Sequence, residues 1–124
     1  MTEARILVAD NEPSMRELLS ITLKRDGYDV STADGGEAAI EAVRREPFDL
    51  VITDVRMPKV DGIQVLKAVK DLAPDTVVIM ITAFSSTENA VEAMKLGAYD
   101  YITKPFKLDE IKLIINNALE QKRL

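Results

Sequence analysis

The stretch that decides the fold is ILVADNEP at residues 6–13, an apolar run that ends in two acidic side chains with an amide between them. Apolar residues in succession, without alternation, are typical of a strand that is buried on both faces of a sheet. We therefore expect the first strand at residues 5–9, followed directly by Asp10 and Asn11. Similar short runs, rich in Val and Ile, predict four further strands at residues 28–32, 48–53, 76–81 and 98–102.

Segments of helical periodicity separate these runs, and most carry start and stop signals. The first helix is expected to begin with a capping box formed by Ser14 and Glu17 and to end before Gly27. The later helices are bounded by Gly35-Gly36 and Pro47, by Asp61-Gly62 and Pro74, and by Ser86 or Thr87 and Gly97, and the last starts near Leu108. In that last helix an apolar stripe predicts the core-facing side, with Leu113 opposite: Leu108, Ile111, Ile114, Ile115, Ala118 and Leu119.

The order of elements is a strand followed by a helix, five times over. Short connections of this kind favour parallel pairing and right-handed crossovers. We expect an α/β fold of the flavodoxin-like, doubly wound (βα)5 type, with one five-stranded parallel sheet covered by helices on both faces. The strand order 2-1-3-4-5 is adopted by analogy with that type of fold.

Composition narrows the range of functions. The chain of 124 residues fits one domain, residues 1–124, with 16 basic and 21 acidic residues and a net charge of −5. It lacks the basic surface that direct nucleic-acid binding requires. With no Cys and no His, zinc sites, thiol chemistry and imidazole bases are excluded. No apolar run approaches a membrane span and no signal-peptide pattern is present, so we expect a cytoplasmic protein without membrane contact.

Polar residues follow the expected strands, and the carboxyl ends of parallel strands meet at one edge of a sheet. This edge would gather Asp10, Asn11, Asp54, Thr82 and Lys104. Singly, each has an ordinary explanation as a helix cap, a strand residue or a surface charge. Because Ser14 is expected to cap the first helix, Asp10 is left free for chemistry.

Carboxylate and amide oxygens together suit Mg²⁺, and Lys104 and the Thr82 hydroxyl would face an anion in the same pocket. The set suggests phosphoryl transfer with Asp54 as nucleophile, forming an acyl phosphate. Mg²⁺ and Lys104 would neutralise charge on the phosphoryl oxygens. Since the pocket offers no acid, the donor must carry a good leaving group, such as a phosphorylated imidazole on a partner.

Taken together, Asp10, Asp54 in DLVITDVRMP, Thr82 in MITA and Lys104 in YITKPF closely resemble the receiver domain of two-component response regulators. The resemblance covers essentially the whole chain. It implies that a sensor histidine kinase phosphorylates Asp54, that the acidic pocket and the Arg56 carbonyl hold Mg²⁺, and that the Lys104-Pro105 peptide is cis. It also implies that the domain is not an enzyme and catalyses only its own phosphorylation and dephosphorylation.

The resemblance further implies a switch. Thr82 would move toward the phosphoryl group and Tyr101 would swing inward, which changes the surface of the fourth helix, fifth strand and fifth helix, a surface that also suits a homodimer. Arg56 and Phe84 would tune the lifetime of the acyl phosphate. The plainer readings are a half-buried strand residue for Tyr101, a surface charge for Arg56 and a loop aromatic for Phe84.

The segment GAYDYITKPF is most similar to receivers of the NtrC-type, sigma-54-dependent transcription activators. This similarity implies that ATPase and DNA-binding domains follow in a longer regulator, from which this chain is an excised piece, and that the output is transcription.

Asn11 departs from the family pattern, which usually has a second acid there that binds the metal directly. We expect weaker Mg²⁺ binding and slower phosphorylation, and the alternative is a degenerate receiver that acts as a docking module without phosphorylation.

Two other classes of protein fit the sequence less well. A haloacid-dehalogenase-like phosphatase would need an acid at the position of Arg56. A nucleotide-binding module would need a phosphate-binding loop where Asp10 and Glu12 would instead repel phosphate.

Overall fold

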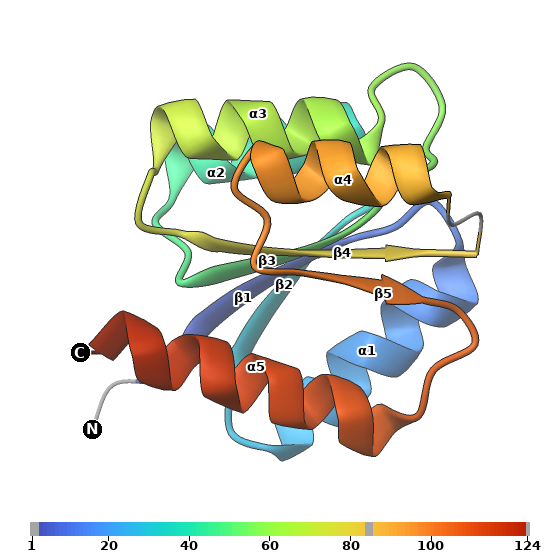
Figure 1. The fold of residues 1–124 in the computed structure, drawn as a ribbon. Coiled ribbons are helices and arrows are strands. Elements are labelled where there is room, and N and C mark those ends of the chain that lie inside the picture. The colour runs from blue at the N-terminus through green and yellow to red at the C-terminus, as the bar shows by residue number, and fades with distance from the viewer. Residues whose placement is uncertain (1–2, 84–85, 124) are drawn as a thin grey trace.

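A parallel sheet of five strands forms the centre of the molecule (Figure 1). The computed structural model describes residues 3–83 and 86–123. The strands lie in the order β2-β1-β3-β4-β5, as expected, and every neighbouring pair is parallel. Their bounds are β1 Arg5–Ala9, β2 Asp29–Ala33, β3 Leu50–Asp54, β4 Val77–Thr82 and β5 Asp100–Thr103.

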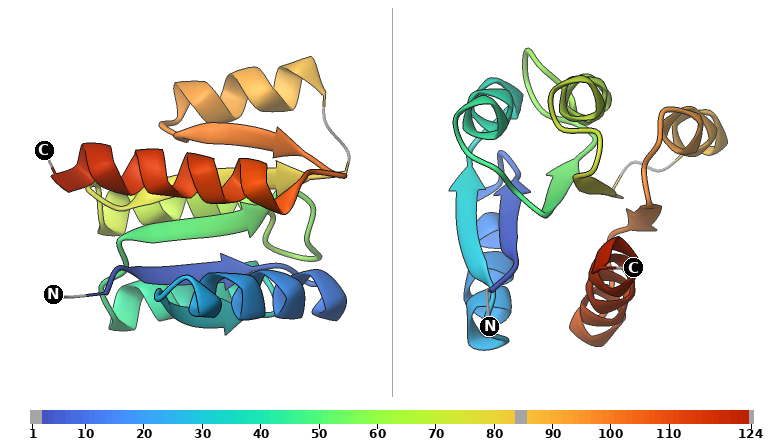
Figure 2. Two further views of the ribbon diagram at one scale, coloured as in Figure 1. Left: turned by 90° about the horizontal axis from the view of Figure 1, so that it is seen from below. Right: turned by 90° about the vertical axis from the view of Figure 1, so that its left-hand side faces the viewer.

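Helices cover both faces of the sheet and give it two separate cores. The helices are α1 Pro13–Arg25, α2 Gly36–Arg45, α3 Gly62–Leu72, α4 Thr87–Lys95 and α5 Leu108–Arg123. Figures 1 and 2 show α1 and α5 on one face and α2, α3 and α4 on the other. Leu7 and Val51 point into the core under α2–α4, whereas Ile6 and Ile52 point into the core over α1 and α5. The unalternating strand sequences follow from this burial on both faces.

Helices α5 and α4 largely follow the sequence pattern, although Leu108 and Ile114 of the expected α5 stripe are only partly buried against the core. On α5, Ile111, Ile115, Ala118 and Leu119 are buried, and Leu113 is 61% exposed. For α4, the alternative between two caps resolves to Ser86, whose side chain accepts a hydrogen bond from the Asn89 N–H. Only Ala93 of α4 is buried, so this helix rests on the sheet through a single fully covered side chain.

The expected capping box at Ser14 and Glu17 is wrong. The helix α1 begins at Pro13, with Glu12 as N-cap and no side-chain capping bond. Proline suits the first helical position, because its fixed φ is helical and its missing N–H has no partner there in any case. The N-cap therefore lies two residues earlier than expected, and Ser14 lies inside the first turn.

The strands after β1 begin and end one or two residues later than expected. Asp54 pairs with Ile81, and Thr82 pairs with Thr103, within the hydrogen-bonded ladders. These polar residues are thus the last residues of strands rather than the first residues after them, because their backbones still pair with the neighbouring strands. Within residues 3–83 and 86–123, no helix is both long enough and apolar enough to span a bilayer.

Candidate functional site

The centre of the site is a lysine held between two carboxylates. Lys104, in the β5–α5 connection, donates from Nζ to Asp10 Oδ2 at 3.2 Å and to Asp54 Oδ2 at 3.0 Å. Asp10 follows β1 and Asp54 ends β3, and these strands are neighbours in the sheet. The side chains of Lys104, Asp10 and Asp54 are only 13%, 4% and 10% exposed, respectively. The strand order therefore brings three residues that are widely separated in sequence into one buried cluster.

Each carboxylate is oriented by a second hydrogen bond from the backbone. The Glu12 N–H donates to Asp10 Oδ1 at 2.9 Å, and the Arg56 N–H donates to Asp54 Oδ1 at 3.0 Å. One oxygen of each aspartate thus meets an amide while the other meets the Lys104 ammonium. Both carboxylates are fixed in orientation before any ligand arrives.

Asp10 also has a role at the start of α1, contrary to the prediction from the sequence. Ser14 was expected to be the N-cap, but the N-cap is Glu12, and the Glu12 N–H donates a hydrogen bond to Asp10. Arg16 adds a bond that the sequence did not suggest, from Nη1 to the Asp10 carbonyl at 2.8 Å. The signal for Arg16 was weak, because a basic residue in the first turns of a helix is usually a solvated charge.

The ionisation of the cluster follows from burial and pairing. Burial raises the pKa of Asp10, and the Glu12 N–H and the Lys104 charge oppose this shift without cancelling it. Burial alone would lower the pKa of Lys104, but the hydrogen bond to Asp54 and the charges of both carboxylates outweigh it, so the pKa is raised. Lys104 is therefore a firmly protonated cation at neutral pH.

Thr82 lies at the same edge, fully buried at the end of β4. Its carbonyl accepts a hydrogen bond from the Lys104 N–H at 2.8 Å, which ties the two residues together through the backbone. The Lys104-Pro105 peptide is cis, as the resemblance implied. Asn11 and Arg56 have exposed side chains beside the cluster, as does Glu12.

Tyr101 points into the core under α2, α3 and α4, where it packs against buried residues. Its hydroxyl oxygen is buried and has no hydrogen-bond partner in the described part of the chain. Burial raises the pKa of this hydroxyl, and the nearby Ser86 backbone opposes the shift without cancelling it. Phe84, the other aromatic singled out from the sequence, lies outside the described residues.

The donor set fits a hard divalent cation with few protein ligands. Two carboxyl groups around one ammonium leave the buried pocket with a formal charge of one negative unit. Mg²⁺ in proteins commonly uses one or two carboxylates and completes its shell with water and phosphate oxygens. Residues 3–83 and 86–123 contain no group of three or more Asp, Glu, His or Cys side chains arranged for a metal. The site thus suits Mg²⁺ bound together with a phosphate, rather than an all-protein metal cage.

Comparison with known proteins gives a consistent family. Residues 6–116 match the response regulator receiver domain. The chain is 46% identical over 114 residues to the transcriptional regulatory protein ZraR of Escherichia coli (strain K12), covering 92% of this chain and 26% of that protein. It is 40% identical over 119 residues to the response regulator protein PilR of Pseudomonas aeruginosa, covering 96% of this chain and 27% of that protein. The chain therefore spans about a quarter of the length of the curated relatives that it matches.

Solved structures give the same result. A CheY-like receiver domain protein from Methanospirillum hungatei JF-1 superimposes with a TM-score of 0.96 at 27% identity, and 98% of each chain is covered. The beryllofluoride-activated NtrC4 receiver domain, solved as a dimer, has a TM-score of 0.89 at 37% identity, covering 95% of this chain and 98% of that one. The expected resemblance to receivers of the NtrC type is confirmed by these relatives.

Proposed function

This chain belongs to the response regulator receiver domain family, and from that premise we propose that Asp54 accepts a phosphoryl group from a sensor histidine kinase in a Mg²⁺-dependent reaction. The observation that carries the proposal is the Asp10–Lys104–Asp54 cluster, in which a buried carboxylate lies beside a fixed cation at the open end of the strands. Such a site combines a nucleophile with positive charge for an incoming anion.

The chemistry proposed for the site is simple substitution at phosphorus. A carboxylate oxygen of Asp54 attacks the phosphorus atom, an O–P bond forms, and the bond to the donor nitrogen breaks with its electron pair leaving on the imidazole. Lys104 pairs with a phosphoryl oxygen as its hold on Asp54 loosens, and the Thr82 hydroxyl donates a hydrogen bond to another. The Arg56 N–H keeps the second Asp54 oxygen in place. Mg²⁺, held by Asp10, Asp54, the Arg56 carbonyl and the Asn11 amide oxygen, would supply further positive charge to the transferring group.

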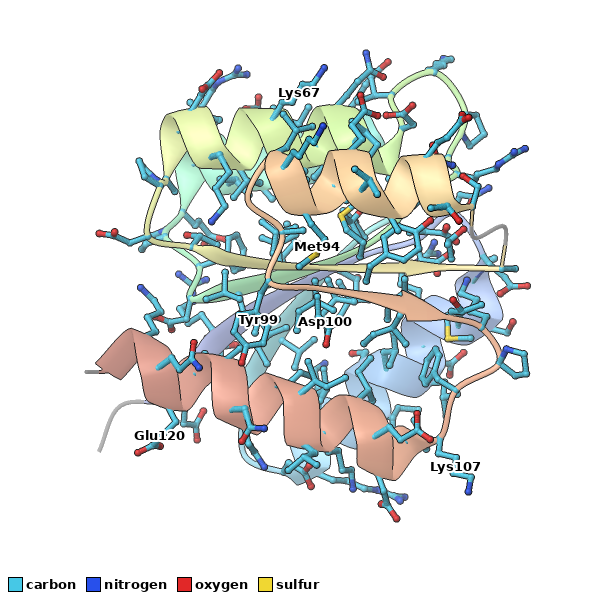
Figure 3. All side chains as sticks on the ribbon, viewed as in Figure 1. Lys67, Met94, Tyr99, Asp100, Lys107 and Glu120 are labelled. Atoms are coloured by element: carbon cyan, nitrogen blue, oxygen red, sulfur yellow. The ribbon has the colours of Figure 1, made fainter. Side chains whose placement is uncertain are left out.

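The proposed output is a change in the surface formed by α4, β5 and α5. Figure 3 views this surface face on, with Met94, Tyr99 and Asp100 between the two helices and Lys107 near the start of α5. Thr82 and Tyr101 would link it to the site, since Thr82 ends β4 at the edge that holds the cluster and Tyr101 lies on the neighbouring strand β5, which contacts α4. Phosphate shifts such an equilibrium only by binding one arrangement better than the other. A homodimer through this surface is part of the proposal, and the NtrC4 receiver domain, which was solved as a dimer, supports self-association.

We also propose that residues 1–124 are the receiver portion of a longer cytoplasmic transcription regulator of the sigma-54-dependent type. The short share of the curated relatives that is covered supports this, and ATPase and DNA-binding domains would occupy the rest. Arg56 and Phe84 would set the lifetime of the phosphorylated state.

The decisive experiment is incubation with Mg²⁺ and a small-molecule phosphodonor, followed by intact mass measurement. The expected result is addition of one phosphoryl group, which Asp54→Asn abolishes. Asp71→Asn, at an exposed position of α3, is the matched control and should remain modified. The exposed amide of Asn11 favours a second candidate, a docking module that works without phosphorylation, and absence of modification at every Mg²⁺ concentration would select it.

A further inference from the structure

The loop between β3 and α3, residues 55–61, sets the orientation of Asp54. It supplies the Arg56 N–H that holds Asp54 Oδ1. The loop closes on itself through bonds from the Val60 N–H to the Pro58 carbonyl and from the Gly62 N–H to the Val55 carbonyl, both 2.8 Å long. Lys59 has a positive φ of 68°, a backbone conformation that residues other than glycine rarely adopt. The path of this loop is therefore tightly determined.

Two glycines allow this path: Gly62 approaches only backbone atoms, and Gly36 approaches both the backbone and the side chain of Val60. A Cβ on Gly62 would lie 2.1 Å from the Asp54 carbonyl oxygen. A Cβ on Gly36, the first residue of α2, would lie 2.2 Å from the Val60 carbonyl oxygen and 2.7 Å from Val60 Cγ1. Real Cβ atoms essentially never approach closer than 3.0 Å, so a methyl group at Gly36 would have to displace Val60 by roughly 1 Å.

We propose that Gly36 is a positioning residue for the phosphoacceptor Asp54, acting through Val60. The loop cannot absorb a displacement at its α3 end, because the next residue, Asp61, is locked in a capping box with Gln64. The displacement is passed instead toward residues 55–58, where the Arg56 N–H sits. The start of α2 thus determines how accurately one oxygen of Asp54 is held, although Gly36 touches no reacting atom.

The part of this inference that concerns phosphorylation rests on the proposed function, whereas the part that concerns the Arg56 N–H does not.

Gly35 provides a matched control one residue away. A Cβ on Gly35 would meet nothing within 4 Å, and its φ of −173° is extended backbone that any residue adopts. As the N-cap of α2, Gly35 still contributes to helix stability, so Gly35→Ala should lower the melting temperature by about 2 to 5 °C without moving the loop.

The test measures two quantities in the same proteins: the solvent exchange rate of the Arg56 amide by NMR, and the rate of phosphorylation by a small-molecule donor at saturating Mg²⁺. For Gly36→Ala we expect faster exchange of the Arg56 amide and phosphorylation slower by about a hundredfold, the scale of a 1 Å misplacement. For Gly35→Ala we expect both rates within about twofold of the unmodified chain, despite its lower melting temperature. A purely structural role for Gly36 would instead make both variants follow their melting temperatures.

A second variant keeps the inference open to refutation should Gly36→Ala fail to fold. Val60→Ala removes the Cγ1 atom that lies beside the position a Gly36 Cβ would occupy, and it leaves the sequence of α2 unchanged. It should speed exchange of the Arg56 amide while the far-ultraviolet circular dichroism stays unchanged. Unchanged Arg56 exchange in Val60→Ala and in any folded Gly36→Ala would overturn the inference. If the unmodified chain takes no phosphate at all, the proposed function fails, and the amide measurement still decides the role of Gly36.

Discussion

Replacing Lys104 by methionine should destabilise the domain strongly, and the loss should depend on pH. The Lys104 ammonium lies 3.0 and 3.2 Å from two carboxylates. At an effective dielectric of about 20, each contact corresponds to about 5 kcal/mol of Coulomb attraction before desolvation is subtracted. Removing one partner of a buried ion pair typically costs about 3–5 kcal/mol. We therefore expect Lys104→Met to lower the free energy of unfolding at pH 7 by about 3 kcal/mol.

The sign of the pH dependence follows from the carboxylates left behind. Burial already raises the pKa of Asp10, and loss of the neighbouring cation raises it further. A carboxyl group whose folded pKa lies above its unfolded value binds more protons when folded, so stability rises as pH falls through the folded pKa. The difference between Lys104→Met and the unmodified chain should therefore shrink as the pH falls through the raised pKa of Asp10.

Urea unfolding followed by circular dichroism at pH 7 and pH 4 measures both effects. Lys107→Met is the matched control, since Lys107 is exposed three residues further on (Figure 3). It should change the free energy of unfolding by less than about 0.5 kcal/mol. A loss for Lys104→Met no larger than that of Lys107→Met, or one that is the same at both pH values, would refute the electrostatic account of the cluster.

Three further predictions follow from individual contacts. Asn11→Asp should bind Mg²⁺ more tightly by calorimetry and be phosphorylated faster, because it adds a charged oxygen ligand beside Asp10; tighter binding by the chain with Asn11 would contradict this. Tyr101→Phe should leave the free energy of unfolding unchanged or raise it by about 0.5–1 kcal/mol, because the buried hydroxyl has no hydrogen-bond partner in the described part of the chain. A clear loss of stability would contradict this. Arg5→Ala should lower the free energy of unfolding by about 1–2 kcal/mol, since Arg5 pairs with Asp29 and Glu46 and stacks on Phe48, and Arg44→Ala, whose pair is exposed, should lose less.

Much of the fold could be predicted from the sequence because burial on both faces leaves a plain signal. The centres of the first and third runs, residues 6–9 and 50–52, contain no polar residue to suggest a solvent-facing side, and a sheet covered by helices on both faces is the arrangement that buries them. Gly97 correctly marked the end of a helix, since it adopts a left-handed φ of 104°. The start of α1 was misjudged because Ser14 and Pro13 give competing signals, and the fixed φ of proline prevailed.

The cluster of Asp10, Asp54 and Lys104 followed from the strand order, which brings the ends of β1 and β3 together with the segment after β5. What could not be predicted is how these side chains are held. The bond from Arg16 to the Asp10 carbonyl and the close approach of Gly36 to Val60 depend on where helices settle against loops. Periodicity and turn signals carry no information about such contacts, because they describe each element alone. The phosphoacceptor role of Asp54 itself stays a prediction until phosphate is seen on it.

Helix α4 has a single buried residue, Ala93, and this weak packing affects which substitutions the helix tolerates during evolution. A helix with few covered side chains opens at a small fraction of the global unfolding free energy. Substitutions along it consequently leave the rest of the domain intact, and exposed positions such as Val91 and Met94 are free to diverge. Duplicated copies of one receiver gene could in this way acquire different partners by changing this helix, while the strands and the residues at their carboxyl ends are inherited unaltered.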